Sequence, residues 1–445
     1  MATDVQKKNY LLPIIVMIFL FAMIAFVTNL AAPIGVIWKN KFQDSNMLGM
    51  MGNMMNFAAY LFMGIPAGKL LSKIGYKKTA LIAIAVGFTG VFIQYLSGIL
   101  GVGDTLFALP ANFIVYLLGA FVCGFSVCML NTVVNPMLNT LGGAGNKGNQ
   151  LIQIGGSFNS LAGTLTPMVV GALIGKVTAD TAITDVNPVL FIAMSVFAVA
   201  FVILAAVSIP EPHMVKKQPN DAPKIKDKYS AWSFRHFVLG VVGIFIYVGI
   251  EIGIPGTLNF FLSDTTARGG GLDPEVAPSI GGFVAGTYWF LMLVGRFVGG
   301  AIGGKVSSKM MLTCVSLVGL ILVIAAIFSP VDSTTSMPVF TGSSFEMTKV
   351  PVSALFLVIC GFCTSIMWGG IFNLAVEGLG KYVAAASGIF MMMVVGGGIL
   401  PLFQNWVADQ SSYMTSYWVI VAGLAYLLFY ALVGCKNVNK NIPVD

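Results

Sequence analysis

Long runs of apolar residues, separated by short polar segments, constrain this chain more than any other feature of its sequence. Twelve stretches reach the roughly 20 mostly apolar residues that a helix needs to cross a bilayer. Charged residues make up only 9% of the chain, against about 25% in soluble domains, and the mean hydropathy is +0.89. A chain of this composition cannot hide its apolar surface from water, so we expect it to fold in a lipid bilayer.

The apolar stretches predict an all-α membrane protein with twelve transmembrane helices. They lie at Tyr10–Trp38, Met47–Leu71, Thr79–Leu100, Leu106–Leu138, Leu151–Gly175, Val189–Ile209, His236–Leu262, Ile280–Gly303, Met310–Phe328, Val352–Ala375, Val383–Val407 and Met414–Val433. Their unbroken apolar character excludes a transmembrane barrel, whose strands alternate over about 10 residues. The first stretch is too long for the core of a signal peptide, so we expect a retained helix.

The basic residues predict the orientation of these helices. With the N-terminus in the cytoplasm, nineteen of the 24 Lys and Arg residues fall on or near the cytoplasmic side. The positive-inside rule predicts this asymmetry. We therefore expect a multi-pass protein with both termini in the cytoplasm. The basic residues are spread over many loops as membrane-flanking anchors, which argues against nucleic-acid binding.

One long charged segment, "EPHMVKKQPNDAPKIKDKYSAWSFR", divides the helices into six plus six. It predicts an N-terminal half at 1–210, a cytoplasmic linker at 211–235 and a C-terminal half at 236–445. The halves repeat weakly, because "PAGKLLSKIGYKKTALIA" after the second helix corresponds to "VGRFVGGAIGGKVSSKMMLTCV" after the eighth. Two such halves are the pattern of a major facilitator transporter, with its site at the midplane between them.

Four further segments predict packing or local structure. Gly295, Gly299 and Gly303 form small-x-x-x-small faces that allow helices to approach closely. The segment "VVGGGILP" (394–401) indicates either an easily bent helix or close packing. The motif "CGFC" (360–363) lies within a predicted helix, which favours packing over redox chemistry. The Ser/Thr-rich segment "FSPVDSTTSMPVFTGSSFEMTKVP" predicts a surface loop.

Glu251 is the acidic residue that falls near the middle of a predicted helix. A charged residue at the bilayer centre costs about +2.5 to +3.5 kcal/mol on insertion scales, and such residues mark proton and substrate pathways. We interpret Glu251 as a proton carrier or an acceptor of sugar hydrogen bonds. The alternative is a structural role, in which it bonds to a neighbouring helix.

Amide and aromatic side chains are frequent in the predicted helices, where charges are rare. Asn131 and Asn135 share a helix face, as do Gln153, Gly156 and Ser160. Amides both donate and accept hydrogen bonds, which suits sugar hydroxyls, whereas hydrogen bonding between helices is the alternative. The predicted substrate-binding residues are Asn29, Asn131, Asn135, Gln153, Asn159, Glu251, Asn259, Tyr288, Trp289, Trp368 and Asn373.

Seven segments, in this order, resemble the fucose–galactose–glucose–proton symporter branch of the major facilitator superfamily. They are "GIPAGKLLSKIGYKK" (64–78), "NTVVNPML" (131–138), "GGSFNSLAG" (155–163), "YVGIEIGI" (247–254), "GRFVGG" (295–300), "IFNLAVEGLG" (371–380) and "VVGGGILP" (394–401). The resemblance implies alternating access, a bacterial inner membrane and a monosaccharide substrate, namely a hexose, a deoxyhexose or an amino sugar. We also expect a monomer with no cofactor and no bound metal.

Two positions depart from the L-fucose carriers of this branch. Those carriers have an acidic residue in the first helix and a glutamate in the fourth, where this chain has Ala32 and Asn131. Many relatives have a glutamate in the seventh helix, and Glu251 matches it. The resemblance therefore makes Glu251 the predicted proton-coupling residue, while coupling to sodium and uncoupled diffusion stay open.

Rival functions find less support in the residues. The chain has only two histidines, His213 and His236, no H-E-x-x-H motif and no nucleotide-binding loop, so we expect neither an enzyme nor an ATP-driven pump. A carrier of organic anions needs an intramembrane cation, and the nearest, Arg296, is predicted at the cytoplasmic end of its helix. A carrier of another non-sugar solute, such as a drug or a peptide, and a transport-derived sugar sensor are further alternatives.

Overall fold

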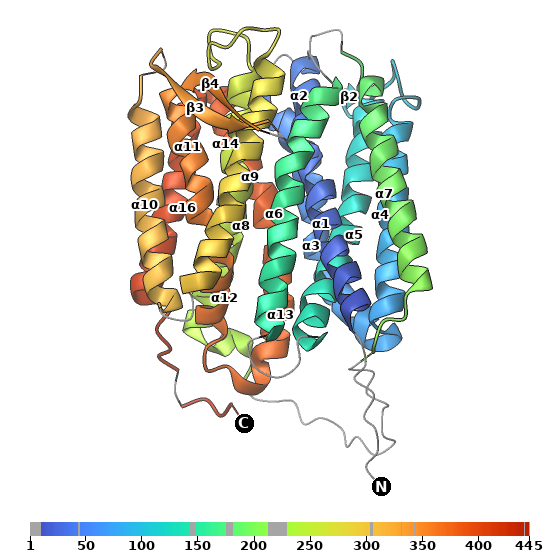
Figure 1. Ribbon diagram of the computed structural model, residues 1–445, viewed down its shortest axis with the longest axis vertical. Helices are drawn as coiled ribbons and strands as arrows, with labels where there is room; N and C mark the ends of the chain where they lie inside the picture. The colour runs from blue at the N-terminus through green and yellow to red at the C-terminus, as the bar shows by residue number, and fades with distance from the viewer. Residues whose placement is uncertain are drawn as a thin grey trace.

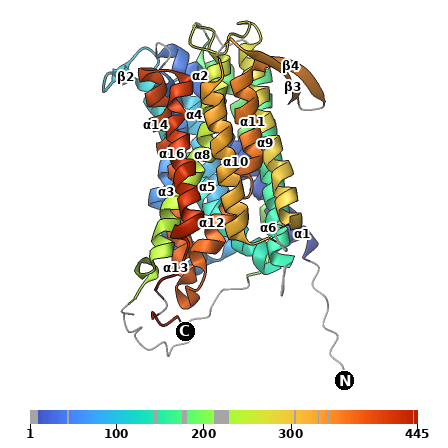
Figure 2. The same cartoon turned by 90° about the vertical axis from the view of Figure 1, so that its left-hand side faces the viewer.

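The computed structural model describes residues 10–42, 45–141, 147–174, 181–211, 229–302, 306–330, 332–341, 344–439 and 441–444. The described chain forms a bundle of long helices that run side by side, with both termini at one end (Figure 1). The view turned by 90° shows the same arrangement (Figure 2). We call this end the terminal end and the opposite one the distal end. Most of the linker predicted at 211–235 lies outside the described residues.

The first half of the bundle contains six crossings. The first is divided into α1 (Leu11–Asn29) and α2 (Ala31–Lys41). The others are α3 (Asn46–Ile74), α4 (Tyr76–Leu96), α5 (Ala111–Leu141), α6 (Lys147–Ile174) and α7 (Asn187–Ala206). A short hairpin of β1 (Thr105–Leu106) and β2 (Leu109–Pro110) lies between α4 and α5, and a 3₁₀ turn, η1 (Ile183–Val186), precedes α7.

The second half begins with a 3₁₀ turn, η2 (Ala231–Ser233), and three unbroken helices. They are α8 (Arg235–Ser263), α9 (Ala277–Ile302) and α10 (Ser308–Phe328). The remaining crossings are divided into α11 (Val352–Thr364) with α12 (Met367–Val376), α13 (Val383–Met393) with α14 (Gly396–Gln410), and α15 (Tyr413–Ser416) with α16 (Trp418–Phe429). A 3₁₀ turn, η3 (Gly380–Tyr382), precedes α13, and a π-helical turn, η4 (Tyr430–Gly434), follows α16.

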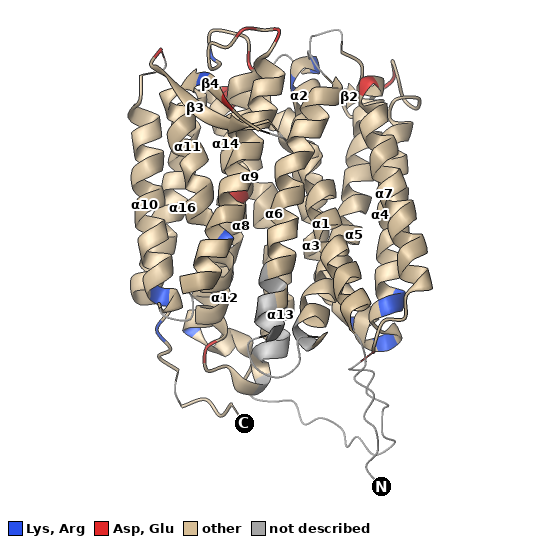
Figure 3. Ribbon diagram, viewed as in Figure 1, with Lys and Arg blue, Asp and Glu red and all other residues tan. Residues whose placement is uncertain are grey.

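The predicted all-α membrane architecture is confirmed. By length and composition, eleven helical segments in the described parts of the chain can cross a membrane. The twelfth predicted crossing is α3, which has 29 residues but carries the buried polar side chains of Asn46, Asn53 and Asn56. Figure 3 shows most of the described charged residues at the two ends of the bundle and few along its body, as a membrane environment requires.

The segment predicted as a Ser/Thr-rich surface loop is instead a β-hairpin at the distal end, so that prediction is wrong. Strands β3 (Thr334–Phe340) and β4 (Phe345–Pro351) pair antiparallel, with Phe340 opposite Phe345. Met337 and Val339 are buried while their neighbours are more exposed, which is the alternation of a half-buried strand. The Phe340 N–H donates to Thr287 Oγ1 of α9 at 2.9 Å, which anchors the hairpin to the bundle.

The glycine-rich segment "VVGGGILP" combines the two predicted properties. The crossing is interrupted between α13 and α14, where the Gly397 and Gly398 N–H groups bond to carbonyls three residues back. A Cβ on Gly398 would lie 2.9 Å from the Met54 carbonyl oxygen of α3, and Gly396 faces the Phe245 carbonyl of α8. The glycines therefore allow both a local change of helix type and close contact with two other helices.

The small-x-x-x-small face of α9 packs as predicted, within the described residues. A Cβ on Gly295 would lie 2.9 Å from the Phe362 carbonyl oxygen of α11, and Gly299 faces Ile366 at the junction of α11 and α12. Gly303 lies outside the described residues. Cys360 and Cys363 of the "CGFC" motif are free and buried, in agreement with a packing role.

Candidate substrate and coupling site

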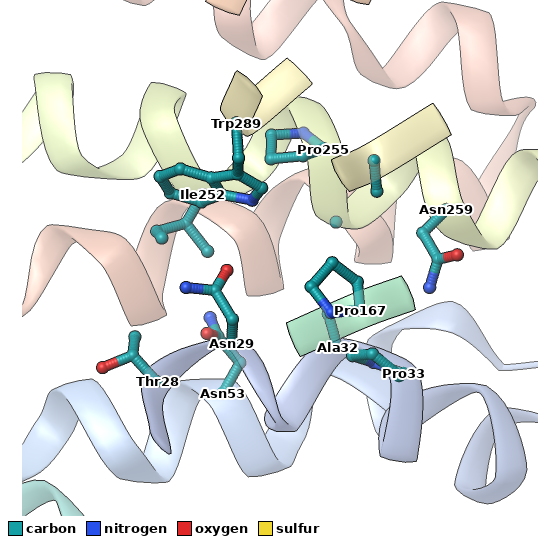
Figure 4. Close-up of a pocket in the computed structure, with 12 residues that line it drawn as sticks. Thr28, Asn29, Ala32, Pro33, Asn53, Pro167, Ile252, Pro255, Asn259 and Trp289 are labelled. Carbon is teal, nitrogen blue, oxygen red and sulfur yellow. The ribbon is translucent and has the colours of Figure 1, made fainter. Parts of the chain in front are cut away.

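A pocket lies between the two halves of the bundle (Figure 4). The first half contributes residues from α1, α2, α3 and α6, and the second contributes residues from α8 and α9. The lining residues are Thr28, Asn29, Ala32, Pro33, Asn53, Pro167, Ile252, Pro255, Gly256, Asn259, Ala285 and Trp289. None of these lining residues is charged, so the pocket offers amides, a hydroxyl and an indole to a neutral solute.

Asn29 and Trp289 face each other across this pocket, from the end of α1 and from α9 (Figure 4). The Asn29 Nδ2 donates to the Ala25 carbonyl at 2.8 Å, which holds the amide at the break between α1 and α2. Gly163 of α6 leaves room for both side chains, since a Cβ there would lie 3.3 Å from Asn29 Nδ2 and 3.4 Å from the Trp289 ring. The glycine therefore helps to bring an amide and an indole together.

Two further amides complete the polar lining. Asn259 of α8 is 3% exposed, and the Ser263 hydroxyl approaches its Oδ1 at 3.5 Å. Asn53 of α3 donates to the Gly397 carbonyl of α14 at 2.8 Å, across the two halves. Asn53 was not among the predicted binding residues. Its sequence signal is the polar side chain inside an apolar stretch, shared with Asn56 one turn further on.

Three of the other predicted amides are engaged with the helices around them. Asn131 donates to the Tyr60 hydroxyl at 2.7 Å, and Asn159 donates to the Phe21 carbonyl at 2.9 Å. Asn135 donates to the Asn131 carbonyl, four residues back in α5, at 3.0 Å. These bonds correspond to the structural alternative considered for the amides, and none of the three residues lines the pocket.

Tyr288, Trp368 and Asn373, which were also predicted to bind substrate, lie outside the pocket. Tyr288 is fully buried, with its hydroxyl 2.9 Å from Thr364 Oγ1 of α11. Trp368 packs against Tyr247 with ring centroids 6.3 Å apart. Asn373 is exposed and is 3.5 Å from Ser308 Oγ. The side chain of Gln153 lies outside the described part of the structure.

Glu251 forms an ion pair with Arg296, which sequence reasoning placed at the cytoplasmic end of its helix. Glu251 Oε1 lies 3.6 Å from Arg296 Nη2, and the two side chains are 12% and 15% exposed. Arg296 Nη1 also donates to the Gly156 carbonyl at 2.5 Å and to Ser160 Oγ at 2.7 Å, both on α6. The long arginine stem carries the charge away from its own Cα, so the backbone position alone was misleading.

Tyr247 lies one helical turn before Glu251 on the same face of α8. Its side chain is fully buried, and its hydroxyl interacts with the Glu251 carboxylate. The phenol therefore adds a polar group that contacts the carboxylate of the ion pair.

A second charged cluster joins the two halves at the distal end. Lys39 Nζ of α2 lies 3.2 Å from Asp264 Oδ2, just beyond α8, and the two side chains are 2% and 4% exposed. The Tyr413 hydroxyl lies 2.6 Å from Lys39 Nζ and 2.8 Å from Asp264 Oδ2. Burial raises the pKa of Asp264, but Lys39, Thr266 and Tyr413 together outweigh it and hold that pKa below its ordinary value. We call Lys39, Asp264 and Tyr413 the distal cluster.

Asp409 at the end of α14 makes a second contact between the halves. Its carboxylate accepts from the backbone N–H groups of Asn46 and Met47 at 2.7 and 2.9 Å, and from Ser45 Oγ at 2.9 Å. A carboxylate is favourable at this position because the first N–H groups of a helix lack partners and carry partial positive charge. The distal end is therefore closed by contacts that the sequence analysis did not predict.

Two sets of helices meet around a polar pocket, and the ion pair of Lys39 and Asp264 joins one set to the other. This arrangement is that of a secondary transporter. The chain belongs to the Major Facilitator Superfamily, whose family model matches residues 14–401. The resemblance inferred from the sequence motifs is thereby confirmed, and the chain is a carrier rather than an enzyme.

Two relatives and one solved structure illustrate the similarity. The chain is 30% identical to a glucose/galactose transporter of Brucella abortus biovar 1 (strain 9-941), over 97% of this chain and 96% of that protein. It is 22% identical to the L-fucose-proton symporter of Escherichia coli (strain K12), over 91% and 89% of the two chains. The crystal structure of the E. coli fucose:proton symporter matches with a TM-score of 0.65 at 18% identity, covering 95% of this chain and 98% of that one. That likeness shows the fold.

Proposed function

We propose that this chain imports a monosaccharide through a cell inner membrane by alternating access, coupled to the entry of a proton. The observation that carries the proposal is the uncharged, amide-lined pocket between the halves, with Trp289 on one wall. The names of the relatives, which include glucose, galactose and L-fucose carriers, support the same substrate class.

The pocket chemistry favours a sugar over the rival substrates. Amides of Asn29, Asn53 and Asn259 can donate to and accept from hydroxyl groups, and the Trp289 ring offers an apolar face. An organic anion would need an available cation, but Arg296 is already paired with Glu251 and bonded to α6. Among the predicted binding residues, Asn29, Asn259 and Trp289 line the pocket, so we propose that these three contact the sugar.

Glu251 is the proposed proton carrier. It would take up a proton from the outer side, remain neutral while the sugar is bound, and release the proton to the cytoplasm. An uncoupled sugar uniporter is the second candidate, because Ala32 lies in the pocket wall where the L-fucose carriers of the resembling branch have an acidic residue. A sodium-coupled symporter would need a cation site made of amides and carbonyls.

Uptake into proteoliposomes tests these candidates. Glucose, galactose, fucose, fructose and N-acetylglucosamine are compared with an inward proton gradient, with an inward sodium gradient and with neither. We expect one or more sugars to accumulate only with the proton gradient. Equilibration without accumulation would indicate the uniporter, accumulation with sodium would indicate the sodium symporter, and no uptake of any sugar would contradict the substrate class.

Glu251→Gln gives the sharper test of coupling. The amide cannot release a proton, so we expect proton-driven accumulation to be lost while exchange of sugar between the two sides continues. Glu346→Gln, at an exposed position of the distal hairpin, is the matched control and should accumulate sugar like the wild type. Intact accumulation in Glu251→Gln would exclude Glu251 as the carrier.

A further inference from the structure

The ion pair of Glu251 and Arg296 has a second set of contacts that proton carriage alone does not use. Arg296 Nη2 faces the carboxylate within the second half, whereas Nη1 donates to Gly156 and Ser160 in the first half. One guanidinium therefore touches both the carboxylate and the interface between α6 and α9. A change of charge on Glu251 acts directly on a group that holds the two halves together.

The α6 surface that receives Arg296 offers acceptors at helical spacing. Gly156 and Ser160 are four residues apart, so they lie on one face of α6. A Cβ on Gly156 would lie in ordinary van der Waals contact, 3.6 Å from Arg296 Nη1, so this position lies directly beside the guanidinium. Ser160 is fully buried, and its hydroxyl accepts from Nη1 at 2.7 Å. From the sequence, this face of α6 was considered for sugar binding. In the structure, Gly156 and Ser160 instead accept hydrogen bonds from Arg296 of the other half.

The contact lies toward the terminal end of the bundle. Gly156 is in the first part of α6 (Lys147–Ile174), and Arg296 is in the last part of α9 (Ala277–Ile302). The distal cluster and Asp409 join the halves at the opposite end. The two sets of contacts therefore close opposite sides of the pocket, as a carrier that opens alternately to each side requires.

Few titratable groups compete for Glu251. Among the described residues, those that face it are Arg296 and Tyr288 on α9 and Tyr247 on α8 itself. Both tyrosines are uncharged near neutral pH, because an unperturbed tyrosine titrates at about 10. Arg296 is thus the charged residue that responds when Glu251 gains or loses a proton.

We propose that Arg296 transmits the protonation state of Glu251 to the contact between α6 and α9. The inference rests on the proposed function, in which Glu251 carries the proton. While Glu251 is ionised, the guanidinium is held between the carboxylate and α6, and the terminal end is closed. When a carboxylate oxygen of Glu251 takes up a proton, the ion pair is lost and a partly buried cation is left without its counter-charge. Such a cation is costly.

The guanidinium then turns toward water and leaves Gly156 and Ser160, so α6 separates from α9 and the pocket opens at the terminal end. Release of the proton to the cytoplasm restores the pair and closes the contact. In this scheme Arg296 is a positioning residue. It neither carries the proton nor binds the sugar, and its effect passes through α6.

The first test compares transport by wild type, Arg296→Gln and Arg296→Lys in proteoliposomes. We expect Arg296→Gln to lower proton-driven accumulation by about tenfold or more, as befits the loss of hydrogen bonds to a charged group. Sugar exchange should continue in this variant but no longer vary with pH. Arg296→Lys keeps the charge and should restore part of the pH dependence. Arg235→Gln, at an exposed position at the start of α8, is the matched control.

The second test measures the contact itself. Spin labels are placed at Phe158 of α6 and Phe297 of α9, both exposed, in full-length protein whose native cysteines are replaced. In the wild type, a second and longer distance between the two labels should appear when the pH is lowered in the presence of sugar. In Arg296→Gln the longer distance should be present at every pH.

The two tests separate this inference from the proposed function. Wild-type protein that never accumulates sugar with a proton gradient would contradict the proposed function itself. Wild-type protein that is proton-coupled but shows the same inter-label distance at every pH would overturn only the role of Arg296. If Arg296→Gln lowers sugar exchange by the same factor at all pH values and leaves its pH dependence unchanged, Arg296 has only a structural role. That result would also overturn the proposed role of Arg296.

Discussion

At the scale of single residues, this chain places its amides in two kinds of environment. Asn131, Asn135 and Asn159 use their N–H groups on partners within the first half, so they stabilise helices or join them. Asn29 and Asn259 line the pocket between the halves. The two kinds are indistinguishable in sequence, because an amide inside an apolar helix looks the same whichever way it faces. Asn29 also donates to a backbone carbonyl, that of Ala25, so only the position of the side chain relative to the pocket separates the two kinds.

Asn259→Ala tests the pocket assignment at this scale. The loss of one neutral hydrogen bond should raise the half-saturating sugar concentration about three- to tenfold, with little change in the maximal rate of exchange. The measurement is exchange in proteoliposomes over a range of sugar concentrations. Asn373→Ala is the control, because Asn373 is exposed and outside the pocket. Equal effects of the two substitutions would contradict a binding role for Asn259.

At the scale of elements, charged residues at helix ends decide how the halves meet. Lys39 ends one crossing and Asp264 follows another, so both look like ordinary residues of external loops in the sequence. In the structure they are paired and almost completely buried. Asp409 likewise ends α14 and accepts from the first N–H groups of α3. Such contacts form only where a charged side chain of one element lies at the same height in the bundle as its partner on another element. The partner is an opposite charge or the free N–H groups at the start of a helix.

The distal cluster predicts a specific effect of acid on stability. The pKa of Asp264 is lowered in the fold, so its stabilising contribution is fully present above the unfolded value of about 3.9. That contribution is lost only as the pH falls through the lower folded pKa. The cluster should therefore stay intact at mildly acidic pH, where a proton gradient would operate. Thermal unfolding of the purified protein between pH 3 and pH 7 measures this.

Substitutions at the same pair separate charge from packing. Asp264→Asn leaves the Lys39 ammonium buried without its counter-charge and should destabilise the fold by about 3–5 kcal/mol. Replacing both residues, as in Lys39→Met with Asp264→Leu, should be close to neutral and should remove the acid-dependent component. Both variants are compared by thermal unfolding at neutral pH. A double variant no more stable than Asp264→Asn would argue against a pair that acts through charge.

At the scale of the whole molecule, the bundle is two sets of helices around one pocket, with its charges at the ends (Figure 3). The pocket has no charged lining residue in the described structure, while charged contacts lie on both sides of it. This separation suits a carrier, because a neutral substrate can bind at the centre while charges govern access. The proposed alternation follows from contacts that close opposite ends.

The orientation in the membrane is testable at the same scale. The distribution of basic residues predicts that the termini are cytoplasmic, so the β3–β4 hairpin should lie outside. A single cysteine at Glu346, in the hairpin, should react with an impermeant maleimide on intact cells. A single cysteine at Val438, near the C-terminus, should react only after the cells are opened. The reverse pattern would contradict the predicted orientation.

The amino-acid sequence by itself determined the membrane class and the approximate limits of the helices. These properties are local, because a helix in lipid must satisfy its backbone hydrogen bonds within itself, and its apolar length is visible in a window of about 20 residues. The isolated carboxylate of Glu251 could be recognised for the same reason, since its cost depends on its depth in one helix.

Only the tertiary structure decided which polar groups meet. Arg296 lies on α9 but contacts Glu251 of α8 and Gly156 of α6. Lys39 pairs with Asp264, which is more than two hundred positions away in the sequence. The β3–β4 hairpin depends on a contact with α9 as well as on its own alternation. Side-chain partners are set by how helices distant in sequence pack together, and close packing selects one arrangement from many that the same apolar pattern would allow.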